Sequence, residues 1–387
     1  MHFAFTDEEA MIRETARRIA RERVAPVAEK LDRGEGRAEL LANLKELAGN
    51  GFMGLNIRAE FGGAEAGTVA FALAIEELAC ACASTATTAS VTNMVGEVIQ
   101  AVGSDRQRAL HLPRLADGTY AAGAFCLTES GAGSDPAAMN TRARREGACY
   151  RLDGEKIYIT SAEYAGIFIV WAVTGPERPK GKGISCFLVE AGTSGLLIGK
   201  AERKMGQTGS ATNSVRFDGC LVPAENLMGR ENDGFRIAVG ELAGGRIGIA
   251  ALSLGIARAA MDAAIAYAHA RVQFGSRISD FQGIQWMIAD RETELEAARL
   301  LILNAAVRKD RGEPFGKEAS MAKLFASEAA HRATDTAIQL HGGAGYLKDY
   351  PVERYARDAR LTRLYEGTSE IQRLIIARDV LRQGSQS

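Results

Sequence analysis

The chain has 387 residues, of which 47% are hydrophobic and 25% charged, and its formal net charge is −1. This length predicts two or three domains with a large core. The near-neutral balance excludes a bulk electrostatic field that would favour nucleic acid or an acidic surface as a partner.

The N-terminus and the cysteines predict a cytoplasmic protein. "MHFAFTDEEA" lacks the basic and apolar regions of a secretory signal, and no run reaches the roughly 18 apolar residues that span a bilayer. The six cysteines are irregularly spaced, without a C-x-x-C pair, so we expect reduced thiols. The five histidines form no H-E-x-x-H or similar set, so no metal site is expected.

Residues 1–119 are predicted to form a helical domain. "FTDEEA" has the pattern of a capping box, in which Thr6 and Glu9 satisfy each other's backbone N–H groups at a helix start. Apolar residues then repeat at helical spacing. Further helices are predicted at about 39–48, as an Ala-rich pair over 69–102, and at about 106–116.

Residues 120–230 are predicted to form a compact β domain. "GIFIVWAV", "GISCFLVE" and "NSVRFDGCLVP" are short β-branched or aromatic runs bounded by Gly, Pro or Asn. "CYRLDGEKIYIT" contains two runs around Asp153-Gly154, which is a hairpin signal.

Residues 231–387 return to helical patterns. One long helix is predicted from about Gly234 to about Arg271, two more over 281–310 and 316–343, and a last one after "EGTS". Four helices of this kind favour an antiparallel bundle.

The segment "AFCLTESGAGSD", residues 124–135, carries the first chemical signal. A strand leads through Thr128 into a loop in which Gly131 and Gly133 allow close backbone approach and Ser134 adds a hydroxyl. Such a loop suits a polar cofactor edge or a phosphate, but an ordinary glycine turn has the same pattern. It is not a dinucleotide fingerprint, because Pro136 stands where G-x-G-x-x-G requires its third glycine.

Three further segments have both a structural and a binding interpretation. In "KIYITSA", Tyr158 can stack on a flat ring, or the segment can be a surface strand. "ARVQFGSRISDFQ" offers polar and aromatic contacts, or is simply an interhelical loop. "QLHGGAGYLKDY" has three glycines where a helix C-cap explains one, which indicates backbone amides presented to an anion.

The carboxylate of Glu366 stands in "RLYEGTSEIQR", just before a helix expected to begin at Thr368 or Ser369. Taken alone, a glutamate at such a position is most often a solvated surface charge, and Gly367 and Thr368 fit ordinary capping.

In order and spacing, these motifs together resemble the flavin-dependent acyl-CoA dehydrogenase family, from "FTDEEA" to "YEGTSEIQR". "CLTESGAGSD", "GGRIGIAALSLGIA", "SMAKLFAS" and "HGGAGYLKDY" are most similar to its short-chain and isobutyryl-CoA dehydrogenase branch. The resemblance implies a multidomain α+β fold, with an all-α N-terminal domain, a β-barrel-like middle domain and a C-terminal four-helix bundle.

The resemblance also implies an FAD site, which neighbouring subunits of a tetramer, a dimer of dimers, complete together. Tyr158 stands where relatives often have Trp. The residues that match FAD contacts are Cys126, Leu127, Thr128, Gly133, Ser134, Tyr158, Ile159, Thr160, Ser161, Arg271, Phe274, Gln282, Gln339, Leu340, Gly342, Gly343, Thr368 and Glu370.

By the same resemblance, Glu366 matches the catalytic base. Some relatives place their base one residue before the arginine that matches Arg246, but this chain has Gly245 there. Ala243 stands where short-chain relatives have an Asp that helps hold the substrate. The residues that match substrate contacts are Ser134, Arg246, Tyr365 and Gly367.

The implied activity is FAD-dependent α,β-dehydrogenation of a short-chain or branched-chain acyl-CoA to the trans-2-enoyl-CoA, with electrons passed to electron-transferring flavoprotein. An acyl-CoA oxidase and a flavin monooxygenase share this fold and are the alternative enzymes. A non-catalytic helical partner that has lost the flavin is the alternative outside enzymes.

Overall fold

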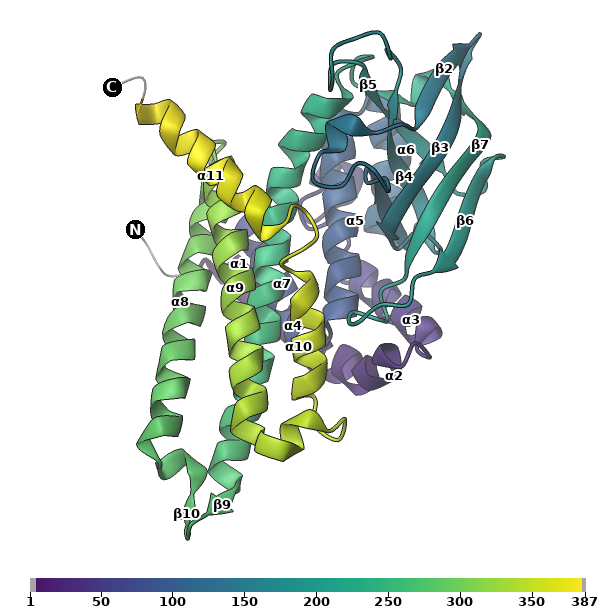
Figure 1. The fold of residues 1–387 in the computed structure, drawn as a ribbon. Coiled ribbons are helices and arrows are strands. Elements are labelled where there is room, and N and C mark those ends of the chain that lie inside the picture. The colour runs from purple at the N-terminus through teal and green to yellow at the C-terminus, as the bar shows by residue number, and fades with distance from the viewer. Residues whose placement is uncertain (1–4, 385–387) are drawn as a thin grey trace.

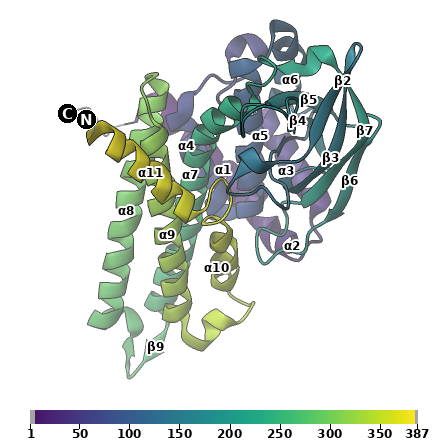
Figure 2. The ribbon, with the colours of Figure 1, turned by 45° about the horizontal axis from the view of Figure 1, so that its top comes forward.

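The computed structural model describes residues 5–384, apart from the side chains at positions 241, 383 and 384. The first four residues of the expected domain 1–119 and the last three of the expected domain 231–387 therefore lie outside the described residues. Figure 1 shows helices at the start and end of the chain and strands between them. Figure 2 shows the same three parts from another side, with the β domain at one flank of the helices.

The N-terminal part consists of helices, as predicted. The capping box is confirmed: Thr6 Oγ1 accepts from Glu9 N at 3.2 Å, and Glu9 Oε2 accepts from Thr6 N at 2.7 Å. A π-helical turn over Ala20–Val24 follows the first helix. The helices are α1 (Asp7–Ile19), α2 (Ala28–Asp32), α3 (Arg37–Gly49), α4 (Gly67–Ala81), α5 (Ala83–Val102) and α6 (Asp105–Ala116).

The middle part is a sheet with strand order β6-β7-β3-β2-β4-β5-β8, and β1 pairs with β4 in parallel. Alternate residues of β4 face two separate cores: Trp171 packs with the helices, whereas Val170 packs with the inner faces of β3 and β7. The sheet therefore encloses a core of its own. Its strands are β1 (Ala122–Cys126), β2 (Arg142–Glu146), β3 (Cys149–Thr160), β4 (Ala165–Val173), β5 (Ile184–Glu190), β6 (Leu196–Ala201), β7 (Thr212–Pro223) and β8 (Leu227–Met228).

The hairpin predicted around Asp153-Gly154 is wrong. Residues Cys149–Thr160 form the single strand β3, and its pairing with β7 shifts register between Leu152 and Gly154. A Cβ on Gly154, which has φ +147°, would lie 2.6 Å from Thr141 Oγ1. The glycine thus marks a bulge and a close approach, and the actual turn lies between β2 and β3 at Gly147.

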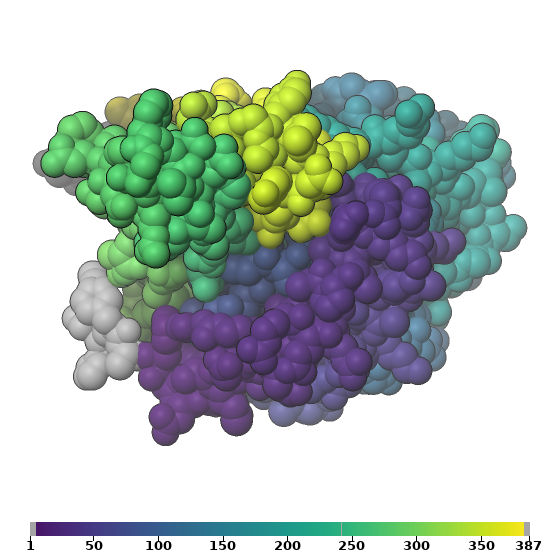
Figure 3. Space-filling view, turned by 90° about the horizontal axis from the view of Figure 1, so that it is seen from below, coloured from purple at the N-terminus to yellow at the C-terminus, as the bar shows by residue number. Residues whose placement is uncertain are grey.

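The C-terminal part contains the predicted long helices α7 (Gly234–Ala270), α8 (Gln282–Asp310) and α9 (Gly316–His341). A small hairpin of β9 (Val272–Gln273) and β10 (Ser276–Arg277) joins α7 to α8. The sequence did not indicate α10 (Val352–Leu361), which packs against α7 and α9, and the last helix, α11 (Ser369–Gly384), packs against α9. Seen from below in Figure 3, this part lies beside the N-terminal helices.

Helix α7 corrects one expectation from the sequence. Its 37 residues include a window with mean hydropathy 1.6, so by length and composition it passes the test for a membrane span. However, 67% of that window is buried inside the fold, as in the core helix of a globular domain. Apolar residues of α7 join those of α4 in one core, for example Leu254 with Leu73 and Ile75.

Candidate active site

Glu366 lies on a left-handed turn between α10 and α11. Its φ is +50°, and that of Gly367 is +91°. A positive φ is unfavourable for a residue with a side chain, and it persists only where surrounding contacts impose it. Thr368 ends the turn, and its Oγ1 accepts from Ile371 N at 3.4 Å, which caps α11.

Two buried side chains from different helices hold this turn. Gln372 Nε2 donates to the carbonyl of Glu366 at 3.1 Å and to that of Gly367 at 2.9 Å. Lys323 Nζ, from α9, donates to the Gly367 carbonyl at 2.7 Å. Both carbonyls are therefore held, while the Glu366 N–H has no acceptor among residues 5–384. The sequence offered one signal for Lys323, a lysine inside the Ala-rich run "SMAKLFAS".

The Glu366 carboxylate reaches α7 at Gly245. Residue 366 is only partly buried as a whole, but its Oε2 atom is fully buried and has no hydrogen-bond partner in the described part of the chain. A Cβ on Gly245 would lie 2.3 Å from this oxygen and 2.6 Å from Met94 Sδ. Gly245 therefore does more than leave this position without a second base. Because it has no side chain, it also leaves the space that the Glu366 carboxylate occupies.

The charges around Glu366 set its protonation. Burial raises the pKa of Glu366 to about 7, and the positive charges of Lys323 and Arg246 act in the opposite direction. Burial also lowers the pKa of Lys323 to about 8 and lowers that of Arg246. Arg246 Nη1 contacts Ser320 Oγ at 3.5 Å, and its buried Nε has no partner among the described residues. A carboxylate whose pKa is near neutrality suits proton transfer.

Tyr365 is held from the other side by Gln207, a residue that the sequence did not single out. Gln207 Nε2 donates to the Tyr365 hydroxyl at 3.5 Å and to the Asp358 carbonyl at 3.1 Å. Thr87 Oγ1 donates to Gln207 Oε1 at 2.7 Å. Burial raises the pKa of Tyr365 well above its ordinary value, so the phenol stays protonated. The turn before α11 is therefore fixed by α5, the middle domain and α10 together.

The two segments expected to flank a flavin lie side by side. Ile157 N donates to the Thr128 carbonyl at 2.9 Å. A buried ion pair supports them, in which Lys156 Nζ lies 2.8 Å from Glu129 Oε1. Tyr158 has φ +58° and is 65% exposed, so its ring is free to stack on a ligand. A Cβ on Gly131 or Gly133 would meet nothing within 4 Å, so ligand atoms have access to the backbone there.

Some residues of this predicted set cannot use their side chains toward a cofactor. Cys126 and Ile159 point into the core of the β domain, and Leu127 into the core between domain and helices. Only their backbone groups are available. Thr160 is partly exposed, and Ser161, at φ +67°, is buried with an Oγ that has no partner among residues 5–384.

A single chain does not bring all predicted cofactor residues together. Figure 1 places the β9–β10 hairpin and the end of α9 at the end of the bundle remote from the α10–α11 turn. Arg271, Phe274 and Gln282 are therefore separated from Glu366, as are Gln339, Leu340, Gly342 and Gly343. Phe274 is 97% exposed at φ +52°, and a Cβ on Gly342 or Gly343 would meet nothing within 4 Å. These open residues fit a ligand that also contacts a second chain.

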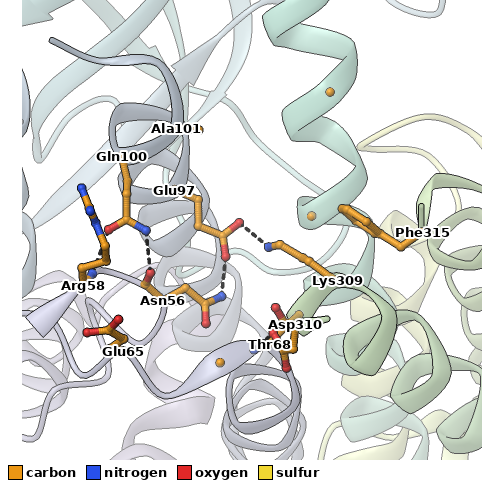
Figure 4. Close-up of a pocket in the computed structure, with 13 residues that line it drawn as sticks. Asn56, Arg58, Glu65, Thr68, Glu97, Gln100, Ala101, Lys309, Asp310 and Phe315 are labelled. Carbon is orange, nitrogen blue, oxygen red and sulfur yellow. Dashed lines mark hydrogen bonds and ion pairs between the residues drawn. The ribbon is translucent and has the colours of Figure 1, made fainter. Parts of the chain in front are cut away.

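The cleft in Figure 4, with a volume of about 550 Å3, lies on another face of α7. Gly240 and Gly244 line it, whereas Gly245 and Arg246 face Glu366. None of the predicted site residues lines this cleft. The cleft is therefore separate from the Glu366 carboxylate.

Comparison with known proteins agrees with this geometry. Residues 6–119, 124–220 and 232–381 match the N-terminal, middle and C-terminal domains of acyl-CoA dehydrogenase. Acryloyl-CoA reductase (NADH) from Anaerotignum propionicum is 44% identical over 99% of this chain and 97% of its own length. The short/branched chain specific acyl-CoA dehydrogenase of Rattus norvegicus is 43% identical over 97% of this chain and 86% of its own length.

One solved structure concerns the electron transferring flavoprotein of Acidaminococcus fermentans and flavin-based electron bifurcation. It matches with a TM-score of 0.96 and 40% identity, over 99% of this chain and 100% of that one. The three matched domains, the relatives' coverage and the shared fold lead to one conclusion. The chain belongs to the acyl-CoA dehydrogenase family, which consists of FAD-dependent oxidoreductases.

Proposed function

We propose that the protein catalyses α,β-dehydrogenation of a short-chain or branched-chain acyl-CoA to the trans-2-enoyl-CoA, with Glu366 as the base. The observation that carries this proposal is the buried, unpartnered Oε2 of Glu366, in a carboxyl whose pKa is raised to about 7. An α-hydrogen of a thioester is a very weak acid, and a desolvated carboxylate is suited to remove it.

The turn supplies the second requirement, a donor for the thioester oxygen. As Glu366 takes the α-proton, negative charge develops on the carbonyl oxygen, and the Glu366 N–H would donate to it. One such donor is often worth about 3 kcal/mol in related oxyanion sites. Gly367 allows the substrate to approach closely, and Arg246, Tyr365 and Ser134 would contact it. FAD, when bound, would supply the acceptor for the hydride that leaves the β-carbon.

The residues that would hold FAD are those of the sequence prediction, used partly through their backbone. Thr128 to Ser134 and Tyr158 to Ser161 would flank the ring system. The start of α11 at Thr368 to Glu370 would face a phosphate, with the Ser369 N–H already donating to the Arg363 carbonyl at 3.0 Å. Arg271, Phe274 and Gln282 would serve a cofactor shared with another subunit.

The CoA moiety would lie beside the Ser134 loop. A cavity of about 210 Å3 adjoins this loop and is lined by Arg142, Arg178 and Lys180, whose positive charges suit phosphates. Ala243 is buried at 8% exposure and offers no carboxylate to the substrate. The short- or branched-chain preference is supported by the rat relative, and with it a role in fatty-acid or branched-chain amino-acid catabolism.

The proposal includes a homotetramer, a dimer of dimers, and electron-transferring flavoprotein as the electron acceptor. The separation of the predicted FAD residues within one chain supports shared sites, as do the exposed Phe274, Trp286 and Tyr346 near the remote end of the bundle. The Acidaminococcus structure supports the acceptor. None of the six cysteines, all of which lie in the described part of the chain, forms a disulfide, which fits a cytoplasmic location.

The test is a panel of C4 to C8, isobutyryl, 2-methylbutyryl, isovaleryl and glutaryl thioesters, assayed with an artificial electron acceptor. We expect turnover with a short or branched member, and Glu366→Gln should lower it by about 10²–10⁴-fold while the purified protein stays yellow and folded. Full activity of Glu366→Gln would contradict the assignment of the base. Peroxide formation without an added acceptor would instead indicate an oxidase.

A second candidate is the reverse reaction, reduction of a short 2-enoyl-CoA. Its support is the 44% identity to the acryloyl-CoA reductase (NADH) of A. propionicum. The same carboxyl would then act protonated, as an acid toward the α-carbon. Measuring acryloyl-CoA reduction and butyryl-CoA oxidation side by side, each with purified electron-transferring flavoprotein, decides the physiological direction.

A further inference from the structure

The proposed mechanism leaves Lys323 without a role, although this lysine is completely buried. Within the described part of the chain, its one hydrogen bond runs to the Gly367 carbonyl at 2.7 Å. Burying an ammonium with one acceptor is unfavourable unless a nearby charge compensates it. The compensating charge is Glu366, which is the largest electrostatic influence that supports the charged form of Lys323.

We propose that Lys323 is a positioning residue for the base: its ammonium holds the Glu366–Gly367 turn, and its positive charge favours the ionised carboxylate. This inference rests on the proposed function of Glu366. The bond to Gly367 comes from α9, so it ties a strained turn to a long helix that packs against both α7 and α11.

The charged surroundings of the site allow the two effects of Lys323 to be separated. Arg246 faces the carboxylate from α7, Glu328 lies further along α9, and Glu370 stands on α11. On α5 the neighbour is the uncharged Met94. Among the described residues, Lys323 is therefore one of two cations that favour ionised Glu366, and of these two it is the one that is also bonded to the turn.

Gln372 provides a matched control. It donates to the same Gly367 carbonyl at 2.9 Å and is also fully buried, but it carries no charge. Removing Gln372 perturbs the turn without removing a charge near Glu366, whereas removing Lys323 does both.

The experiment measures flavin reduction by the best acyl-CoA of the panel, in the FAD-loaded enzyme, as a function of pH. In the unchanged protein, the rate should rise as Glu366 loses its proton. Lys323→Met and Lys323→Gln should both move this rise to higher pH by ~1 unit, because an adjacent cation favours the ionised carboxylate. Gln372→Met should slow the reaction with the midpoint unchanged, and Lys323→Arg, which keeps the charge, should also leave the midpoint in place.

Melting temperature and FAD content are recorded for every variant. A lower melting temperature with an unmoved midpoint in both uncharged variants would show a purely structural lysine and overturn the inference. If Lys323→Met does not fold, Lys323→Gln decides the result, because it keeps a donor to the Gly367 carbonyl. A midpoint shift in Lys323→Arg equal to that in Lys323→Gln would also contradict the inferred role of Lys323. Absence of flavin reduction by any thioester in the unchanged protein would contradict the proposed function instead.

Discussion

Two clusters of charged side chains lie on different faces of α7, and they are built in opposite ways. In the cleft of Figure 4, Glu97 accepts from Lys309 Nζ at 2.7 Å and from Asn56, and Asp310 accepts from Thr68 N at 2.7 Å. At the other cluster, by contrast, two buried atoms of charged groups, Glu366 Oε2 and Arg246 Nε, have no partner in the described structure. Paired charges hold elements together, whereas unpaired buried ones have shifted pKa values and mark a functional site.

The largest expected effect concerns stability at the unpaired cluster. Burial raises the pKa of Glu366 from 4.5 to about 7, so between these values the folded chain keeps a proton that the unfolded chain releases. The free energy of unfolding therefore falls as pH rises through this range, by about 3 kcal/mol from this group. Glu366→Gln does not titrate, so its stability relative to the unchanged protein should increase from pH 4.5 to pH 8. Urea denaturation at both values measures this difference, and an equal difference at both would contradict the buried-base assignment.

The next effect concerns the space at Gly245. A Cβ there would lie 2.3 Å from Glu366 Oε2, so Gly245→Ala should displace the carboxylate and slow flavin reduction by about 100-fold. The matched control is Gly240→Ala on the same helix, where a Cβ meets nothing within 4 Å. That variant should keep its activity and gain ~0.5–1 kcal/mol in the free energy of unfolding, because alanine favours helix. Equal rates for the two variants would disprove the steric role of Gly245.

The smallest effect concerns the paired cluster. Lys309→Met removes the cation that pairs with Glu97, whose side chain is 13% exposed. We expect a loss of about 1–2 kcal/mol in unfolding free energy, since one carboxylate stays partly buried without its cation. The rate of flavin reduction should change less than twofold. A large loss of rate with unchanged stability would contradict the interpretation that the Glu97–Lys309 cluster is structural and the Glu366 cluster functional.

Much of the fold follows from local patterns in the sequence. The capping box at Thr6, the apolar periodicities of α4, α5, α7, α8 and α9, and the short runs of β4, β5 and β7 each depend on neighbouring residues, so they were predictable. The Asp153-Gly154 signal failed because the same dipeptide serves a hairpin turn and a bulge. Only its packing against Thr141 distinguishes the two.

The order of motifs in the sequence determined the family and directed attention to Glu366 and the Thr128–Ser134 loop. The tertiary structure alone decided which groups surround that carboxylate. Lys323 lies 43 residues before Glu366 in the chain and Gly245 lies 121 before it, and no local periodicity relates such positions. Helical spacing predicts that a residue lies on a buried face, but the packing of α7, α9 and α11 decides which charge it meets there. Desolvation and electrostatic shifts depend on that three-dimensional proximity, so the protonation of Glu366 is a property of the assembled fold.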